Sequence, residues 1–166
     1  MRRSIHRGKV GDFGIETVTL PNGVTVDLEI LKHPGASAVV PLHSDGSITL
    51  IRQYRHAAGG MIYEAPAGKL EPGEDPRLCA ERELTEETGL VAGKLTRLTT
   101  IHTTPGFTDE VIHLYVATEL SEGPAHPEAD EVIERCRFSK DEVLAMIRDG
   151  RITDGKTICA VFLALA

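Results

Sequence analysis

Hydrophobic and polar residues alternate near the start of the chain in the way that β-strands require. Residues 14–31 alternate on both sides of Pro21-Asn22-Gly23, and Asn-Gly favours the tight turn of a hairpin. An isolated hairpin is only marginally stable in water, so it must dock against another surface. We therefore expect residues 1–35 to form an N-terminal β-hairpin extension and residues 36–166 to form the main domain.

Strand-like segments continue along the main domain. Two segments rich in β-branched residues, 36–42 and 47–54, flank His43-Ser44-Asp45-Gly46 and predict a second hairpin that enters the core. Further strands are expected at residues 59–68, 95–102, 110–117 and 132–138.

Helix signals lie between and after these strands. Pro76 suits the first turn of a helix that should end near Thr88, because Gly89 is a good left-handed cap. Ser139 opens a second helix with a capping box, and Asp154 is expected to cap a final apolar helix. Strands flanked by helices predict an α/β fold, an α/β/α sandwich around a mixed sheet.

One of these helices carries three glutamates on a single face. Glu83, Glu86 and Glu87 stand at positions i, i+3 and i+4, and residues at these spacings are neighbours on a helix surface. Like charges this close repel, so a cation is expected among them. Hard divalent cations such as Mg²⁺ prefer carboxylate oxygen and bridge to substrate phosphates. The spacing therefore predicts Mg²⁺-dependent phosphate chemistry.

A solvated acidic helix face is the alternative interpretation of the same glutamates, because a run of charge usually has that meaning. It accounts for the polarity of the helix but not for the spacing. Glu83 and Glu87 form a like-charge pair that costs roughly 0.2–0.5 kcal/mol, whereas a merely soluble helix would mix charge signs. Positions that break a local rule tend to mark functional sites.

Composition restricts the class of protein further. The chain has 166 residues, 41% of them hydrophobic, which is enough for one sizeable core. Its formal net charge of −7 argues against nucleic-acid binding through a basic surface. The longest apolar run, residues 158–166, is too short to span a bilayer, and Arg2-Arg3 is followed by residues too polar for a signal peptide.

The cysteines and histidines suggest no competing chemistry. Cys79, Cys136 and Cys159 are odd in number and too scattered for a CxxC metal site or a disulfide framework. None of the seven histidines forms an HExxH motif. We expect reduced thiols and a soluble, cytoplasmic protein that binds neither membranes nor nucleic acid.

Residues 68–90 resemble the signature of the Nudix hydrolases. Gly68 is followed after five residues by Glu74, and after seven more by Arg-Glu-Leu-Thr-Glu-Glu-Thr-Gly-Leu. Nudix enzymes cleave a nucleoside diphosphate linked to another moiety, by attack of water on phosphorus. The resemblance therefore implies a Nudix hydrolase domain over residues 36–166.

Two segments outside the signature resemble the ADP-ribose pyrophosphatase branch of that family. They are residues 50–67 and the proline of Thr104-Pro105-Gly106-Phe107, fifteen positions past Leu90. The resemblance implies hydrolysis of ADP-ribose to AMP and ribose 5-phosphate. The expected cofactor is Mg²⁺, with Mn²⁺ as a substitute.

The resemblance also implies roles for residues in and next to the signature. The metal ligands of the family match Glu83, Glu86, Glu87 and the backbone carbonyl of Ala67. Glu74 and Arg82 are expected in a supporting role, in which the arginine pairs with an acid of the signature and steadies the loop and helix that present those ligands. Gly68 is expected mainly as a backbone requirement, with ligand contact as the alternative.

Substrate contacts are implied for residues on the strands and on the loop around Pro105. Arg55 and Glu64 match residues that help to hold the substrate, and a guanidinium suits phosphate oxygens. Exposed strand charge is the alternative for Arg55 and Arg52. Phe107 either lines the substrate pocket or packs locally.

The catalytic base of the branch is a glutamate in the loop before the penultimate strand. Glu131 and Glu128 are the candidates, with Glu131 ahead because it borders the strand 132–138. A solvated acidic loop is the alternative interpretation of both.

Relatives in this branch form homodimers through crossing N-terminal strands, which suits the extension at residues 1–35. Two other functions remain open. One is a Nudix hydrolase of a different substrate, such as a nucleotide sugar, FAD or another dinucleotide, or an oxidised nucleoside triphosphate. The other is a nucleotide-binding sensor without turnover, although such modules usually lack box glutamates that are present here.

Overall fold

The computed structural model of the chain describes residues 1–123 and 132–166. Its strands are β1 (Arg2–Arg7), β2 (Asp12–Thr19), β3 (Thr25–Lys32), β4 (Ala36–Pro41), β5 (Ile48–Arg55), β6 (Gly60–Glu64), β7 (Ala67–Lys69), β8 (Leu90–His102), β9 (Val111–Glu122) and β10 (Ile133–Phe138). Its helices are α1 (Pro76–Thr88), α2 (Lys140–Arg148) and α3 (Gly155–Ala164), with a 3-10 turn η1 (His56–Ala58). The described strands form three sheets, ordered β1-β2-β3, β10-β5-β6 and β7-β4-β9-β8.

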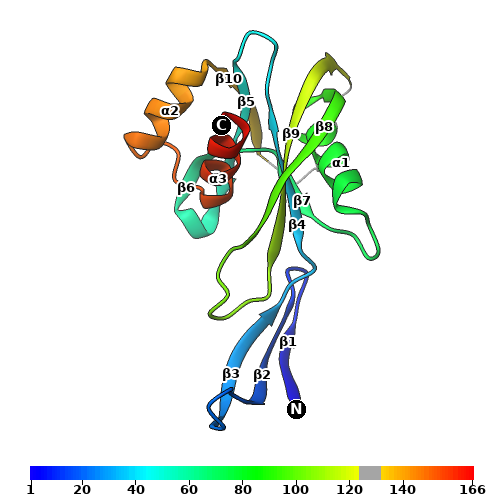
Figure 1. Cartoon of the computed structure of the whole chain (residues 1–166), viewed down its shortest axis with the longest axis vertical. Helices are drawn as coiled ribbons and strands as arrows, with labels where there is room; N and C mark the ends of the chain where they lie inside the picture. The colour runs from blue at the N-terminus through cyan, green and yellow to red at the C-terminus, as the bar shows by residue number, and fades with distance from the viewer. Residues whose placement is uncertain (124–131) are drawn as a thin grey trace.

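The N-terminal extension is a three-stranded sheet at one end of the molecule, as Figure 1 shows. The predicted hairpin is confirmed as β2 and β3, which pair from Asp12 with Lys32 to Thr19 with Thr25. The third strand, β1, was missed because its sequence RRSIHR has no alternation of apolar and polar residues. It is held to β2 by polar contacts, including an ion pair between Arg2 and Glu16 at 2.7 Å.

The second predicted hairpin has the expected turn, but its two strands part into different sheets. The His43 amide bonds to the Ser47 carbonyl at 2.9 Å, and Leu42 bridges Ile48. Beyond that bridge β4 pairs with β7 and β9, whereas β5 pairs with β6 and β10. The predicted strand at 59–68 is also divided, into β6 and β7, at Ala65-Pro66.

The mixed sheet β7-β4-β9-β8 lies between two layers of helix (Figure 1). Strand β4 runs parallel to β9 and antiparallel to β7. Side chains alternate across a strand, so Ala38 and Val40 join a core cluster with residues of α2 and α3, while Val39 joins a second cluster with Leu84 of α1. The α/β/α arrangement around a mixed sheet confirms the fold expected from the sequence.

The helix boundaries follow the predicted caps. Asp75 accepts a hydrogen bond from the Arg77 amide at the start of α1, and Gly89 ends that helix with φ of 68°. Ser139 and Asp154 cap α2 and α3 through the amides of Glu142 and Thr157. Within the described residues, no helix is long and apolar enough to cross a membrane.

Candidate active site

Helix α1 presents its glutamates toward the strand that precedes it. Glu83 and Glu87 are buried, whereas the side chain of Glu86 is 39% exposed. The helix is tied to the sheet at its first turn, where Ser37 Oγ donates to the Pro76 carbonyl at 2.7 Å. The three carboxylates therefore lie at the boundary between α1 and β7 rather than on a solvated helix face.

The backbone of β7 approaches these glutamates closely. The Ala67 amide donates a hydrogen bond to Glu87 Oε2 at 2.9 Å. A Cβ built on Gly68 would lie 1.8 Å from Glu83 Oε1, which is far inside van der Waals contact. A side chain at residue 68 would therefore displace the Glu83 carboxylate, which gives the expected backbone requirement a specific steric reason.

Arg82 connects the signature loop to two of these glutamates. Its Nε and Nη2 donate to Glu74 at 3.0 and 3.1 Å, and its Nη1 donates to Glu83 at 2.6 Å and to Glu86 at 3.0 Å. The hydrogen bond from Arg82 lowers the pKa of Glu74, and the bond to Glu74 raises the pKa of Arg82. Arg82 therefore pairs with acids of the signature, as expected, and it contacts Glu74 through two nitrogens.

The donor atoms around β7 suit a hard divalent cation. The carboxylates of α1 and the nearby backbone supply oxygen ligands, and the Glu83 carboxylate lies directly against Gly68. As the side chains stand, no group of three or more His, Cys, Asp or Glu within the described residues converges on one point. The Arg82 guanidinium bridges Glu83 and Glu86, so a cation would have to take over those two contacts.

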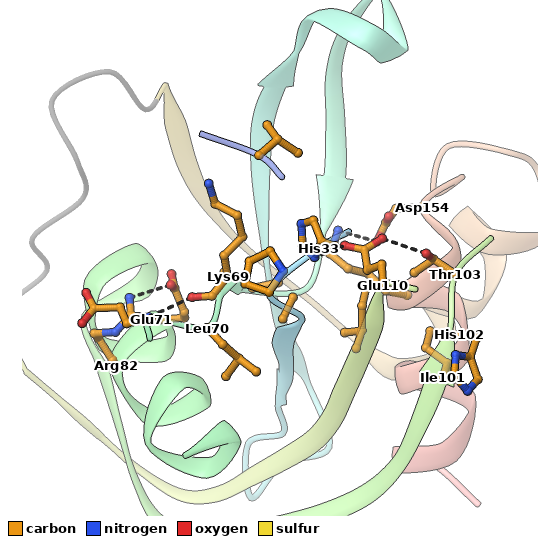
Figure 2. Close-up of a pocket in the computed structure, with 18 of the residues that line it drawn as sticks. His33, Lys69, Leu70, Glu71, Arg82, Ile101, His102, Thr103, Glu110 and Asp154 are labelled. Carbon is orange, nitrogen blue, oxygen red and sulfur yellow. Dashed lines mark hydrogen bonds and ion pairs between the residues drawn. The ribbon is translucent and has the colours of Figure 1, made fainter. Parts of the chain in front are cut away.

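An open cavity of about 1470 Å³ lies beside this cluster. Arg82, Glu71 and Leu70 line one side, while His33, Glu110, Thr103 and Asp154 line the other, as Figure 2 shows. Drug-sized ligands occupy roughly 300–1,000 Å³, so the cavity has room for a dinucleotide-sized molecule. Glu83 and Glu86, with Ala67 and Gly68, lie in its wall.

Arg55 reaches the cavity from β5 and is held by a buried carboxylate. Its Nε and Nη2 donate to Glu64 Oε1 and Oε2 at 2.8 and 2.9 Å, and Lys156 Nζ donates to Oε2 at 2.8 Å. The Glu64 side chain is 2% exposed and does not line the cavity, whereas Arg55 and Lys156 do. Burial alone would raise the pKa of Glu64, but the bonds from Arg55 and Lys156 outweigh burial and the pKa is lowered.

Besides Glu64, three of the predicted substrate residues do not line the cavity. Arg52 faces the opposite side of β5, where it lies 3.5 Å from Glu134 and over the Tyr63 ring. Phe107 is 53% exposed, and its carbonyl accepts a bond from the Leu31 amide. Pro105, in the same loop, is exposed. The two candidate bases, Glu128 and Glu131, lie outside the described residues.

The sequence interpretation missed the far wall of the cavity. His33 Nδ1 lies 3.4 Å from Glu110, which also accepts a bond from Thr103 at 2.7 Å. These residues come from the end of β3 and from the loop between β8 and β9, so no local motif joins them. Lys156 was missed too, although a lysine in the first turn of an otherwise apolar helix was a usable signal.

Comparison with known proteins places this site in a family. The model of the NUDIX domain matches residues 31–161, and the chain belongs to that family, whose members generally use a divalent metal. An ADP-ribose pyrophosphatase of Bacillus subtilis (strain 168) is 42% identical over 162 residues, which are 96% of this chain and 88% of that protein.

Two further comparisons bear on the same fold. A methanol dehydrogenase activator of Bacillus methanolicus is 45% identical over 159 residues, which are 95% of this chain and 86% of that protein. A solved structure described as an ADP compounds hydrolase superposes with a TM-score of 0.84 and covers 99% of this chain and 90% of its own, at 22% identity. At that identity the superposition shows the fold alone.

Proposed function

We propose that this protein hydrolyses the diphosphate bond of ADP-ribose, giving AMP and ribose 5-phosphate. The observation that carries the choice of substrate is the 42% identity to an ADP-ribose pyrophosphatase over 96% of the chain. The cavity agrees with it, because the signature glutamates and Arg55 line one space that can take a nucleoside diphosphate derivative.

In this proposal the metal is Mg²⁺, with Mn²⁺ as a substitute. Glu83, Glu86, Glu87 and the Ala67 carbonyl would hold it, since all supply hard oxygen ligands next to Gly68. When bound, the metal lowers the pKa of a water and offsets charge on the phosphate oxygens.

Other residues of the chain hold the signature loop, bind phosphate and supply the base in this proposal. Arg82 stays paired with Glu74 and keeps the loop of the signature against α1. Arg55, held in place by Glu64, directs its remaining donors at a phosphate oxygen. Glu131 or Glu128 supplies the base, as the sequence comparison with the branch implies.

The N-terminal sheet is proposed as the surface that joins two copies of the chain. The small sheet leaves Ile5, Val24 and Leu28 at least 38% exposed, and the family match begins only at residue 31. We propose an extension over 1–35 and a hydrolase domain over 36–166, and a family match that begins near this division, at residue 31, supports it. The three cysteines are free thiols, which supports a reducing, cytoplasmic location.

A second candidate function follows from the 45% identity to a methanol dehydrogenase activator. By its name, that relative activates methanol dehydrogenase, so this candidate predicts that the chain raises the rate of a methanol dehydrogenase. Nucleotide sugars are a further candidate substrate, because GDP-mannose pyrophosphatases of Yersinia are 35% identical over 133 residues.

A substrate panel separates the candidate substrates from one another and from a nucleotide-binding sensor, while the rate of a methanol dehydrogenase with and without the protein tests the activator function. ADP-ribose, FAD, NADH, GDP-mannose, diadenosine polyphosphates and 8-oxo-dGTP are each incubated with the protein in Mg²⁺ and in EDTA, and products are resolved by chromatography. Metal-dependent release of AMP and ribose 5-phosphate with the highest kcat/KM supports the proposal. A higher kcat/KM for another compound would make that compound the preferred substrate. Tight nucleotide binding without turnover would favour a nucleotide-binding sensor.

A further inference from the structure

The first turn of α3 is hydrogen-bonded to the backbone at Ala65, three residues before the Nudix signature begins at Gly68. The Ala65 amide donates to Thr157 Oγ1 at 2.7 Å, and Thr157 Oγ1 donates to Asp154 Oδ2 at 2.5 Å. Lys156 Nζ lies 3.0 Å from the same Asp154 oxygen. This turn therefore fixes both the strand end at Ala65 and the ammonium group of Lys156.

Glu64 gathers two cations on one buried carboxylate. Its Oε2 accepts from Arg55 and from Lys156, and its Oε1 accepts from Arg55. The carboxylate lies behind these cations, because Glu64 is 2% exposed while Arg55 is 42% and Lys156 14% exposed. Arg55 and Lys156 thus lie between Glu64 and the cavity, which Asp154 also lines.

Both cations keep donors that are unused by the described residues. Glu64 takes the Nε and Nη2 of Arg55, and no described residue accepts from its Nη1. The ammonium of Lys156 has three donors, of which Glu64 and Asp154 take two. The remaining donors belong to side chains that line the cavity. A phosphoryl group, with several acceptor oxygens and negative charge, is the ligand that matches them.

We propose that Arg55 and Lys156 together bind one phosphoryl group of the substrate, with Glu64 and Asp154 holding the two cations in place. The inference rests on the proposed diphosphate chemistry and assigns a role to Lys156. It places the unused donors of Arg55 and Lys156 on the wall that carries Asp154, across the cavity from Arg82 (Figure 2).

The test measures binding of inorganic pyrophosphate by isothermal titration calorimetry, so that it does not depend on turnover. Lys156→Gln keeps a hydrogen-bond donor for Glu64 but removes the charge, and Lys156→Arg restores a charge. Lys94→Gln is the control, because Lys94 is exposed on β8 and does not line the cavity. We expect Kd to rise about tenfold or more in Lys156→Gln, with little change in the other two variants.

Melting temperature and KM for the best substrate of the panel complete the test. A lower melting temperature in Lys156→Gln with unchanged pyrophosphate affinity would overturn the inference, because Lys156 would then serve the fold alone. Failure of the unmodified protein to bind pyrophosphate would overturn it as well. If pyrophosphate binding depends on Lys156 but ADP-ribose is not cleaved, the anion site stands and the proposed substrate fails.

Discussion

The alpha carbon of Gly68 lies so close to Glu83 that a methyl group there would meet Glu83 Oε1 at 1.8 Å. The Glu83 carboxylate thus packs directly against the backbone of β7, and a side chain at residue 68 would have to displace it. The Glu83 carboxylate cannot move away at no cost, because Arg82 holds it at 2.6 Å.

Gly68→Ala is therefore expected to lower the free energy of unfolding by about 1–3 kcal/mol, the usual cost of overpacking, and to reduce kcat sharply. Urea unfolding and steady-state kinetics measure the two effects. Gly106→Ala is the stability control, since a Cβ there meets nothing within 4 Å. Equal stability of the two variants would show that the Glu83 carboxylate can be displaced at little cost, which would contradict this prediction.

Glu87→Gln should reduce kcat roughly 100-fold or more while leaving the fold intact, because an amide is a poorer ligand for a hard cation. The new amide oxygen can still accept the bond that the Ala67 amide donates to Glu87. Circular dichroism and activity at saturating Mg²⁺ check the two parts. EDTA should abolish turnover of the unmodified protein, and near-normal turnover of the variant would overturn the assignment of Glu87.

Arg82→Lys should destabilise the protein by about 1 kcal/mol, because an ammonium cannot span Glu74, Glu83 and Glu86 as the guanidinium does. The Arg82 side chain is 28% exposed. Arg77→Lys is the matched control on the same helix, where a 59% exposed arginine makes one ion pair with Glu81. Urea denaturation in EDTA compares the variants, and equal losses would argue against a special role for Arg82.

Stability should depend on pH through Glu64, whose pKa is lowered from the usual 4.5 despite its burial. A depressed folded-state pKa means that the unfolded chain takes up the proton first. The stabilisation is therefore complete above about pH 4.5 and is lost as the pH falls through the lower folded value.

Glu64→Gln supplies the comparison for this pH effect. At neutral pH the free energy of unfolding of the variant should be about 3 kcal/mol lower than that of the unmodified protein, because Arg55 and Lys156 lose a buried anionic partner. This difference in the free energy of unfolding should shrink as the pH falls below about 4.5. A difference that stays constant with pH would show that the Glu64 carboxylate does not titrate in this way.

The thiols should differ in reactivity. Burial raises the pKa of Cys79 to about 11, and its thiol lies 3.5 Å from the Gly68 carbonyl. Cys159 is exposed. We expect a thiol reagent at neutral pH to label Cys159 rapidly and Cys79 only after unfolding, as mass spectrometry of digested protein will show. Rapid labelling of Cys79 in the native state would indicate that α1 opens from β7.

Elements with local signals were predictable from the sequence. The hairpin around Asn22-Gly23, the start of α1 at Pro76 and its end at Gly89 follow from turn and cap chemistry that acts over a few residues. The signature glutamates and the family were predictable for the same reason, since residues 68–90 hold them in one stretch. The family match over residues 31–161 confirms that prediction.

The sheet partners of β1, β4 and β5 were not predictable in this way. Strand pairing depends on residues that are distant in the chain. The turn between β4 and β5 does not decide whether these two strands continue in the same sheet or in different sheets. The polar β1 has no pattern of its own and forms only because β2 offers it a partner.

The sequence by itself determined the family and the helix that carries the signature glutamates, because the spacing of Glu83, Glu86 and Glu87 and the cap at Gly89 are local properties of one helix. Only the tertiary structure decided what surrounds that chemistry. It buried Glu64 behind Arg55 and turned Arg52 to the other side of β5. It also brought Lys156 into contact with Glu64, which lies 92 residues earlier in the chain. Contacts of that kind depend on the packing of whole layers, which no short segment encodes.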